Sequence, residues 1–232
     1  MHVPRDPKAL AKSLRQALAA RDIDITHSDS LECVARQFGW RDWNTLASQV
    51  DRPTLRMPED WSVGGSHRDD YEMGFDPKER CALIRYVVIG AAPVTAHRGS
   101  GFGTLMQHFR ADLYLGKRLQ LRGQLKAADV TGAATIWLRI DGDKGRILAF
   151  DNMESRVNEG ALVGTVDWKD RAIVLDVPTD AQSIHFGFYL RGGGSVWARQ
   201  FRFAAVDASV PVTDLIPARR SAPANLDFAD VA

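Results

Sequence analysis

A chain of 232 residues has room for one large domain or two small ones. Hydrophobic residues make up 45% and charged residues 25%, an ordinary globular composition that excludes a collagen, a coiled coil and a wholly disordered chain. With 30 Lys and Arg against 29 Asp and Glu, the formal charge is +1, so no global field favours nucleic acid or an anionic membrane.

Cysteine usage and the N-terminus indicate the compartment. Cys33 and Cys81 lie far apart and match neither a disulfide framework nor the C-x-x-C spacing of a metal site, so we expect two reduced, partly buried thiols. The opening MHVPRDPKALAK lacks the apolar region of a signal peptide, and the apolar runs are too short to span a bilayer. We expect a cytoplasmic protein with no membrane contact.

Residues 1–50 carry apolar residues at helical spacing and predict three short helices. Pro7 suits the first turn of the first helix, Thr26, Ser28 and Asp29 are candidate caps for the second, and Gly39 is its expected end. A module this small has little core and needs contact with the rest of the chain or with a second copy. The three apolar stripes are Leu10, Leu14, Ala17 and Leu18; Leu31, Val34, Ala35 and Phe38; and Trp43, Leu46, Ala47 and Val50.

The remaining chain divides into three segments. Residues 51–60 lose the period and contain two prolines, which indicates a linker. Residues 61–206 alternate apolar and polar side chains in short runs between Gly, Asp and Pro turns, as in KRLQLRGQLK, TIWLRID and SIHFGFYLR. Residues 207–232 are Pro- and Ala-rich and predict a mobile tail, in which Asn225–Phe228 could be a docking motif.

The fold class that follows is α+β by content and mainly β. We predict an antiparallel jelly-roll β-sandwich preceded by a small N-terminal three-helix module.

A series of motifs in the sandwich resembles a known family. GFGTLMQHF, YLGKRLQLRG, WLRIDG, LAFDNM, GTVDW, VLDVP and HFGFYLRGGGSVW occur in this order between residues 101 and 197. Together with WSVGGSHRDDYEMGFD they are similar to a bacterial galactose-binding-like β-sandwich that is often attached to AraC-type or helix-turn-helix transcriptional regulators. The resemblance covers about residues 61–214 and implies the sandwich fold and a regulatory context, but no particular activity.

The helical part resembles a different family. The segment from Leu10 through SLECVARQFGWRDWNTLA is similar to a small module of glyoxalase-related proteins. That name implies metal-binding His and Glu residues on βαβββ units, and the sequence downstream of the module has no such units.

One face of the sandwich is the candidate ligand site. If the aliphatic residues of each strand point inward, the alternate positions present aromatic rings among bidentate hydrogen-bond donors, a combination that suits a sugar ring or another polar ligand. The alternative is that Trp137 and Tyr189 cover the sheet or pack against the helices. The candidate ligand-binding residues are Arg122, Gln124, Trp137, Arg139, Asp151, Asn152, Arg156, His185, Tyr189 and Arg191, of which Asp151, Asn152 and Arg156 form the rim or an Asx turn.

The sequence lacks the motifs that are typical of catalytic and cofactor-binding sites. The six histidines show no ligand spacing, there is no G-x-S-x-G motif, and the glycines near Ser100 and Ser195 lead into strands rather than helices. We therefore predict no catalytic residues, no metal centre and no cofactor. A structural calcium ion on Asp141, Asp143 and Asp151, and an enzyme that uses Glu154, Glu159 or Asp167, remain alternatives.

The helical module is the candidate partner site. Its second and third helices join at Gly39 in the outline of a helix-turn-helix, which would expose Arg41, Asn44 and Thr45 to DNA. Residues 1–50 contain seven basic and six acidic residues, a net charge too small to favour phosphate binding. Trp40 and Trp43 favour a contact with a protein partner or within the chain itself.

Our hypothesis is a non-enzymatic binding or regulatory protein. The sandwich face would recognise a polar small molecule, a glycan or a protein, and the helices would mediate a protein contact, with homo-oligomerisation compatible with the sequence. The alternatives are a DNA-binding transcriptional regulator and a carbohydrate-active or glyoxalase-related enzyme.

Overall fold

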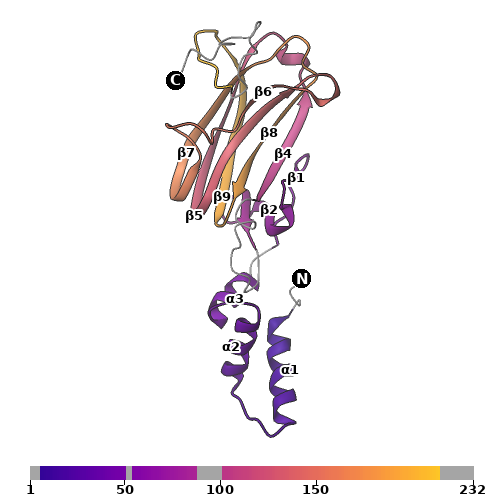
Figure 1. The fold of residues 1–232 in the computed structure, drawn as a ribbon, viewed down its shortest axis with the longest axis vertical. Helices are drawn as coiled ribbons and strands as arrows, with labels where there is room; N and C mark the ends of the chain where they lie inside the picture. The colour runs from indigo at the N-terminus through magenta and orange to yellow at the C-terminus, as the bar shows by residue number, and fades with distance from the viewer. Residues whose placement is uncertain (1–5, 51–53, 88–100, 215–232) are drawn as a thin grey trace, which may run out of the picture.

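The computed structural model describes residues 6–50, 54–87 and 101–214. Within these ranges the chain forms three α-helices followed by nine β-strands, and every strand pairing is antiparallel (Figure 1). The predicted fold class, mainly antiparallel β with a small helical module, is confirmed.

The helical module consists of α1 (Pro7–Ala19), α2 (His27–Gln37) and α3 (Trp43–Val50). Of the three predicted caps for α2, Thr26 is the N-cap, and it forms a capping box with Asp29. Asp42 caps α3 by accepting hydrogen bonds from the backbone N–H of Thr45 at 2.8 Å and from its hydroxyl at 2.6 Å. These bonds satisfy donors that each first helical turn leaves free.

The three helices share a small core of their own. Ala11, Val34, Ala35 and Leu46 are buried in it. Partly buried residues that pack around these four include Leu10, Leu14, Leu31, Phe38, Trp40 and Trp43. The predicted apolar stripes therefore meet one another.

The strands run through the rest of the described chain. Their bounds are β1 (Ser62–Gly64), β2 (Tyr71–Asp76), β3 (Cys81–Tyr86), β4 (Phe102–Arg110), β5 (Arg118–Asp141), β6 (Ile147–Asp151), β7 (Leu162–Asp176), β8 (Ser183–Arg191) and β9 (Ser195–Val206).

Strand β5 belongs to both layers of the sandwich. Its first half, up to Ala128, lies between β7 and β9. From Ala133 onward its second half pairs with β8, and from Leu138 onward it also pairs with β6 on the other side. Layer one is therefore β7–β5–β9–β3–β2, and layer two is β6–β5–β8–β4–β1. The sequence predicted two separate strands here, KRLQLRGQLK and TIWLRID, but the chain runs on through AADVTGAA, where Asp129 adopts a positive φ of 54°.

The sandwich core lies between the two layers. Both halves of β5 contribute alternate aliphatic residues that are inaccessible to solvent, and full burial of each contributes about 1.5–3 kcal/mol. Other strands add Ile84, Leu105, Ile173 and Phe188. The β5 residues are Leu119, Leu121 and Leu125 in layer one, and Ile136, Leu138 and Ile140 in layer two.

The segments on either side of the sandwich also contact it. From residue 54 onward, the predicted linker lies against β2, where Arg56 forms a bridge with Phe75 and Leu55 is buried. After β9, Thr213 exchanges hydrogen bonds with Val174 of β7, and Asp214 accepts one from the Phe150 backbone. The rest of the predicted tail, including residues 225–228, lies outside the described residues.

Two further sequence expectations concern cysteines and membranes. Cys33 is exposed and Cys81 is buried, and both are free thiols. Burial is the main cause that raises the pKa of Cys81 to about 11. Among the described helices, none has the length and apolar character needed to cross a bilayer.

Candidate functional site

The outer face of layer two contains a cavity of about 480 Å³. Side chains of β4, β5, β6 and β8 form its apolar floor, and polar side chains of the same strands and of the loop after β6 form its rim. The floor consists of Phe102, Met106, Trp137, Phe150 and Tyr189. The polar lining consists of Thr104, Arg139, Asn152, Glu154 and Arg191.

Trp137 occupies the centre of this floor because of the strand register. It lies opposite Gly187 of β8, which has no side chain, so the indole reaches across β8 to β4. There its Nε1–H donates a 3.0 Å hydrogen bond to the hydroxyl of Thr104, which donates in turn to the Phe188 carbonyl at 2.8 Å. Trp137 is only 8% exposed, so it is both a floor residue and a packed one.

Tyr189 forms the floor beside Phe102. The two ring centroids are 5.6 Å apart with the rings tilted, a favourable aromatic arrangement. Burial raises the pKa of Tyr189 well above its ordinary value, and the neighbouring Glu154 carboxylate, to which its hydroxyl is hydrogen-bonded, raises it further. Tyr189 therefore remains a neutral donor at physiological pH.

The rim carries both signs of charge. Arg191 Nη2 lies 3.0 Å from Glu154 Oε1, and both side chains are partly exposed. Asn152 Oδ1 accepts the backbone N–H of Glu154 at 3.2 Å, an Asx turn that fixes the loop after β6. The rim thus offers a guanidinium, a carboxylate and an amide above an apolar floor.

A polar cluster adjoins the cavity through Arg139. Arg139 donates to Asp141 at 2.8 Å, and Asp141 Oδ2 lies 3.3 Å from His185 Nε2. The His185 ring stacks on His108 with centroids 5.3 Å apart. Burial, together with the charges of Arg139 and His108, lowers the pKa of His185 despite the opposing effect of Asp141.

This cluster does not have the geometry of a nucleophilic triad. Ser183 Oγ lies 2.9 Å from Nε2 of His185, the same ring nitrogen that faces Asp141. In a Ser-His-Asp triad the serine and the carboxylate engage opposite nitrogens of the imidazole. Within the described ranges Nδ1 of His185 is buried without a hydrogen-bond partner.

Asp151 and Arg156 form an internal ion pair rather than a ligand surface. The Asp151 side chain is fully buried, contacts the Arg156 guanidinium and accepts the Met153 backbone N–H at 2.7 Å. Arg156 also donates to the Ala172 carbonyl of β7 at 3.0 Å. The pair anchors the loop that carries Asn152 and Glu154, and neither member is part of the cavity lining.

Arg122 and Gln124 lie on the wrong face for this cavity. Both point outward from layer one, where Gln124 donates to Asp170 at 3.1 Å and accepts from Arg199 at 2.9 Å. The prediction treated the polar positions of every strand as one surface. Because β5 changes layers, the polar positions of its two halves lie on different layers.

Five of the ten candidate ligand residues line the cavity, and several cavity residues were missed. Trp137, Arg139, Asn152, Tyr189 and Arg191 line the cavity, with His185 next to Arg139. The missed residues are Gly65, Phe102, Thr104 and Met106, together with Glu154, which was considered only as a catalytic acid. The alternation in GFGTLMQHF already placed residues 102, 104 and 106 on the same face of one strand. It did not show whether that face points into the core or out to the solvent.

The structure places the four candidate partner residues of the helical module in two environments. Trp40 and Trp43 are partly buried against the core of their own module, which is where their apolar surface is used. Arg41 and Asn44 are exposed, and Arg41 is paired with Asp42 at 2.8 Å. Of the four, only these two polar residues remain largely available to a partner.

The acidic residues considered for metal or catalysis are dispersed. Asp141 and Asp151 are each paired with an arginine, and Glu159 and Asp167 are exposed away from the cavity. In the parts of the chain that the structure describes, no three His, Cys, Asp or Glu side chains are grouped to hold a metal ion.

Fold and site together define a mainly antiparallel β-sandwich with an aromatic-floored cavity on one outer face. Residues 2–73 match the family model described as Glyoxalase superfamily protein. Over 171 residues the chain is 40% identical to the "Uncharacterized HTH-type transcriptional regulator YbfP" of Bacillus subtilis (strain 168), and the alignment covers 72% of this chain and 56% of that protein. The chain therefore spans little more than half the length of this relative.

Solved structures with similar folds superpose only in part. The bacteriophage CBA120 tailspike protein 4 enzymatically active domain has a TM-score of 0.44 at 16% identity, covering 64% of this chain and 20% of that one. A xylan-binding domain from CBM 22 has a TM-score of 0.44 at 11% identity, covering 63% and 87%. TmCBM61, solved with beta-1,4-galactotriose, has a TM-score of 0.39 at 13% identity, covering 67% and 100%.

Proposed function

We propose that this chain is a non-enzymatic binding protein whose cavity on layer two recognises a polar, ring-bearing ligand, with a sugar as the best fit. The observation that carries the proposal is the cavity itself, an aromatic floor beneath a rim of paired charges. We also propose that the sandwich is related to the galactose-binding-like domains and that the protein is cytoplasmic. In this proposal the helical module ends at residue 50, the linker at residue 60 and the sandwich at residue 206.

The cavity matches both the apolar face and the polar groups of such a ligand. Trp137 and Tyr189 offer flat apolar surfaces to the C–H face of a sugar ring, and both also carry polar groups that already have partners inside the protein. Arg191 and Arg139 can donate hydrogen bonds to the hydroxyls of a sugar, and Glu154 can accept them, because all three side chains line the cavity. A volume of about 480 Å³ falls within the range of small-molecule sites.

A regulatory role is supported by the relative with 40% identity, which is named as an HTH-type transcriptional regulator. In this proposal the helical module transmits ligand binding through a protein contact. DNA binding by the module is the second candidate, since Arg41 and Asn44 are exposed at the start of α3. It predicts duplex affinity that falls steeply with salt and is lost in Arg41→Ala and Asn44→Ala.

The proposal is tested by screening the full chain against neutral hexoses, uronic acids and their short oligomers. A bound sugar at one hundred times its Kd adds about 2.7 kcal/mol of stability, or roughly 5–10 °C in Tm for a domain of this size. Arg191→Met should weaken that sugar in calorimetry, while Arg122→Met, on the other layer, serves as the matched control.

Two results would contradict the proposal. One is a panel in which no sugar shifts Tm, or a shift that the Arg191 and Arg122 variants change equally. The other is turnover of a bound sugar that disappears in Glu154→Gln, because Glu154 is the carboxylate that lines the cavity, and such a loss would assign an enzyme.

A further inference from the structure

The second half of β9 is a free sheet edge. Strand β3 pairs with β9 only as far as Ala198, whereas β5 pairs with the opposite side of β9 as far as Val206. Among the residues that the structure describes, no strand lies along the outer side of positions 201–206. An unprotected edge of this length presents unpaired N–H and C=O groups to which another strand can add.

Beneath this edge the sandwich is open and lined with aromatic rings. Phe201 and Phe203 point from β9 into a cleft of about 440 Å³, which Trp61, Gln107, Phe109 and Phe186 also line. The rings of Phe203 and Phe186 are 4.8 Å apart, and those of Phe203 and Phe109 are 5.3 Å apart, so the cleft walls are held in place. The inner side of an added strand would meet an apolar surface.

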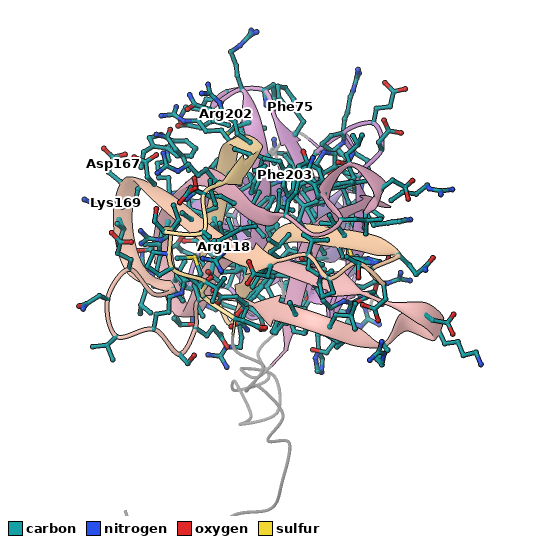
Figure 2. The ribbon with its side chains drawn as sticks, turned by 90° about the horizontal axis from the view of Figure 1, so that it is seen from above. Phe75, Arg118, Asp167, Lys169, Arg202 and Phe203 are labelled. Carbon is teal, nitrogen blue, oxygen red and sulfur yellow. The ribbon has the colours of Figure 1, made fainter. Side chains whose placement is uncertain are left out.

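The outer side of the same edge carries an uncompensated charge. Arg202 lies directly opposite Arg122 of β5, and both are exposed (Arg202 is labelled in Figure 2). Two like charges in this position destabilise a sheet. Neighbouring cations on this face have acidic partners, such as Arg118 with Asp176 at 2.7 Å, but within the described residues neither Arg122 nor Arg202 forms an ion pair.

We propose that Leu226-Asp227-Phe228 of the same chain docks along this edge as an added strand. In this arrangement Leu226 and Phe228 point into the aromatic cleft, and Asp227, between them, lies beside Arg202 on the outer side. The alternation of apolar, acidic and apolar residues matches the alternation of the two sides of the edge. Asp227 would supply the negative charge that the arginine pair lacks.

The chain is long enough for this contact. Thr213 is hydrogen-bonded to Val174 of β7. Val174 lies opposite Gln120 of β5, which in turn lies opposite Ala204 of β9. From Thr213 to a strand added beyond β9 is four strand spacings, about 19 Å at ~4.8 Å each. Residues 214–226 can extend to about 40 Å, which leaves slack for the path around the sheet.

Hydrogen exchange of the full chain tests the docking. The amides of residues 201–206 that face away from β5 should exchange at least about tenfold faster in Leu226→Ala/Phe228→Ala than in the unaltered chain. Val231→Ala, a tail change of the same kind outside the tripeptide, is the control and should exchange like the unaltered chain. Equal exchange in all three proteins would overturn the proposal.

A charge exchange tests the assigned neighbours. Asp227→Lys and Arg202→Glu should each speed exchange at this edge, and the two together should restore slow exchange. Additive effects without restoration would overturn the pairing of these residues. Protection that disappears on dilution would overturn docking within one chain and assign the edge to a second copy.

Discussion

The hydrogen bond between Trp137 and Thr104 holds the cavity floor, and its removal has a calculable cost. In Thr104→Val the isosteric side chain cannot accept the indole N–H, which lies 3.0 Å away, with Trp137 8% and Thr104 4% exposed. An unsatisfied buried donor costs about 1–3 kcal/mol. For a protein of this size that corresponds to a fall in Tm of roughly 2–12 °C.

Two companion variants isolate this bond. Thr104→Ser keeps the hydroxyl and loses one buried methyl group, worth about 0.8 kcal/mol. In a Trp137→Phe background no indole N–H is present that could lose its acceptor. Thr104→Val should therefore lower the unfolding free energy by about 1–2 kcal/mol less in that background than in the unaltered chain. Urea unfolding followed by fluorescence measures each value. If Thr104→Val is as stable as Thr104→Ser, or if the two changes are additive, the bond does not position the indole.

Three further predictions concern the parts around the cavity. Because burial lowers the pKa of His185 in the folded protein, the unfolded chain binds the proton first as pH falls below about 6.5. The unfolding free energy should therefore decrease in that range, and His185→Gln should remove the decrease in pH titrations of stability. Arg156→Met leaves the fully buried Asp151 carboxylate unpaired and should cost about 3 kcal/mol in urea unfolding; a cost near zero would mean the pair does not anchor the loop. Thr26→Ala removes the α2 cap and should cost about 1 kcal/mol of helical-module stability, seen as lost helical signal before the sandwich unfolds; unchanged melting would contradict the capping box.

Local features were predictable from the sequence because their causes are local. The cap at Thr26 and the stop at Gly39 depend on side-chain and backbone preferences within a few residues, and the structure has both, with Gly39 at a φ of 77°. The alternation in strands β4, β5 and β8 likewise sets which side chains share a face of one strand.

The arrangement of those faces was not predictable, because it depends on which distant strands pair. Nothing in AADVTGAA distinguishes a turn between two strands from a crossing in which β5 leaves β7 and β9 for β8. Arg122 and Arg139 look equivalent in the sequence, yet they lie on different layers.

The central claim, a ligand site on the face of layer two, is tested most directly by ¹⁵N–¹H spectra of the tryptophan side chains during titration with the sugar that gives the largest shift in Tm. We expect the Trp137 indole resonance to shift and to saturate as sugar is added, because this ring forms the centre of the cavity floor. Trp168 and Trp197, which carry stacked cations on layer one, should not move. Shifts of the layer-one tryptophans with Trp137 unchanged would place the site on the other layer and overturn the ligand site on layer two.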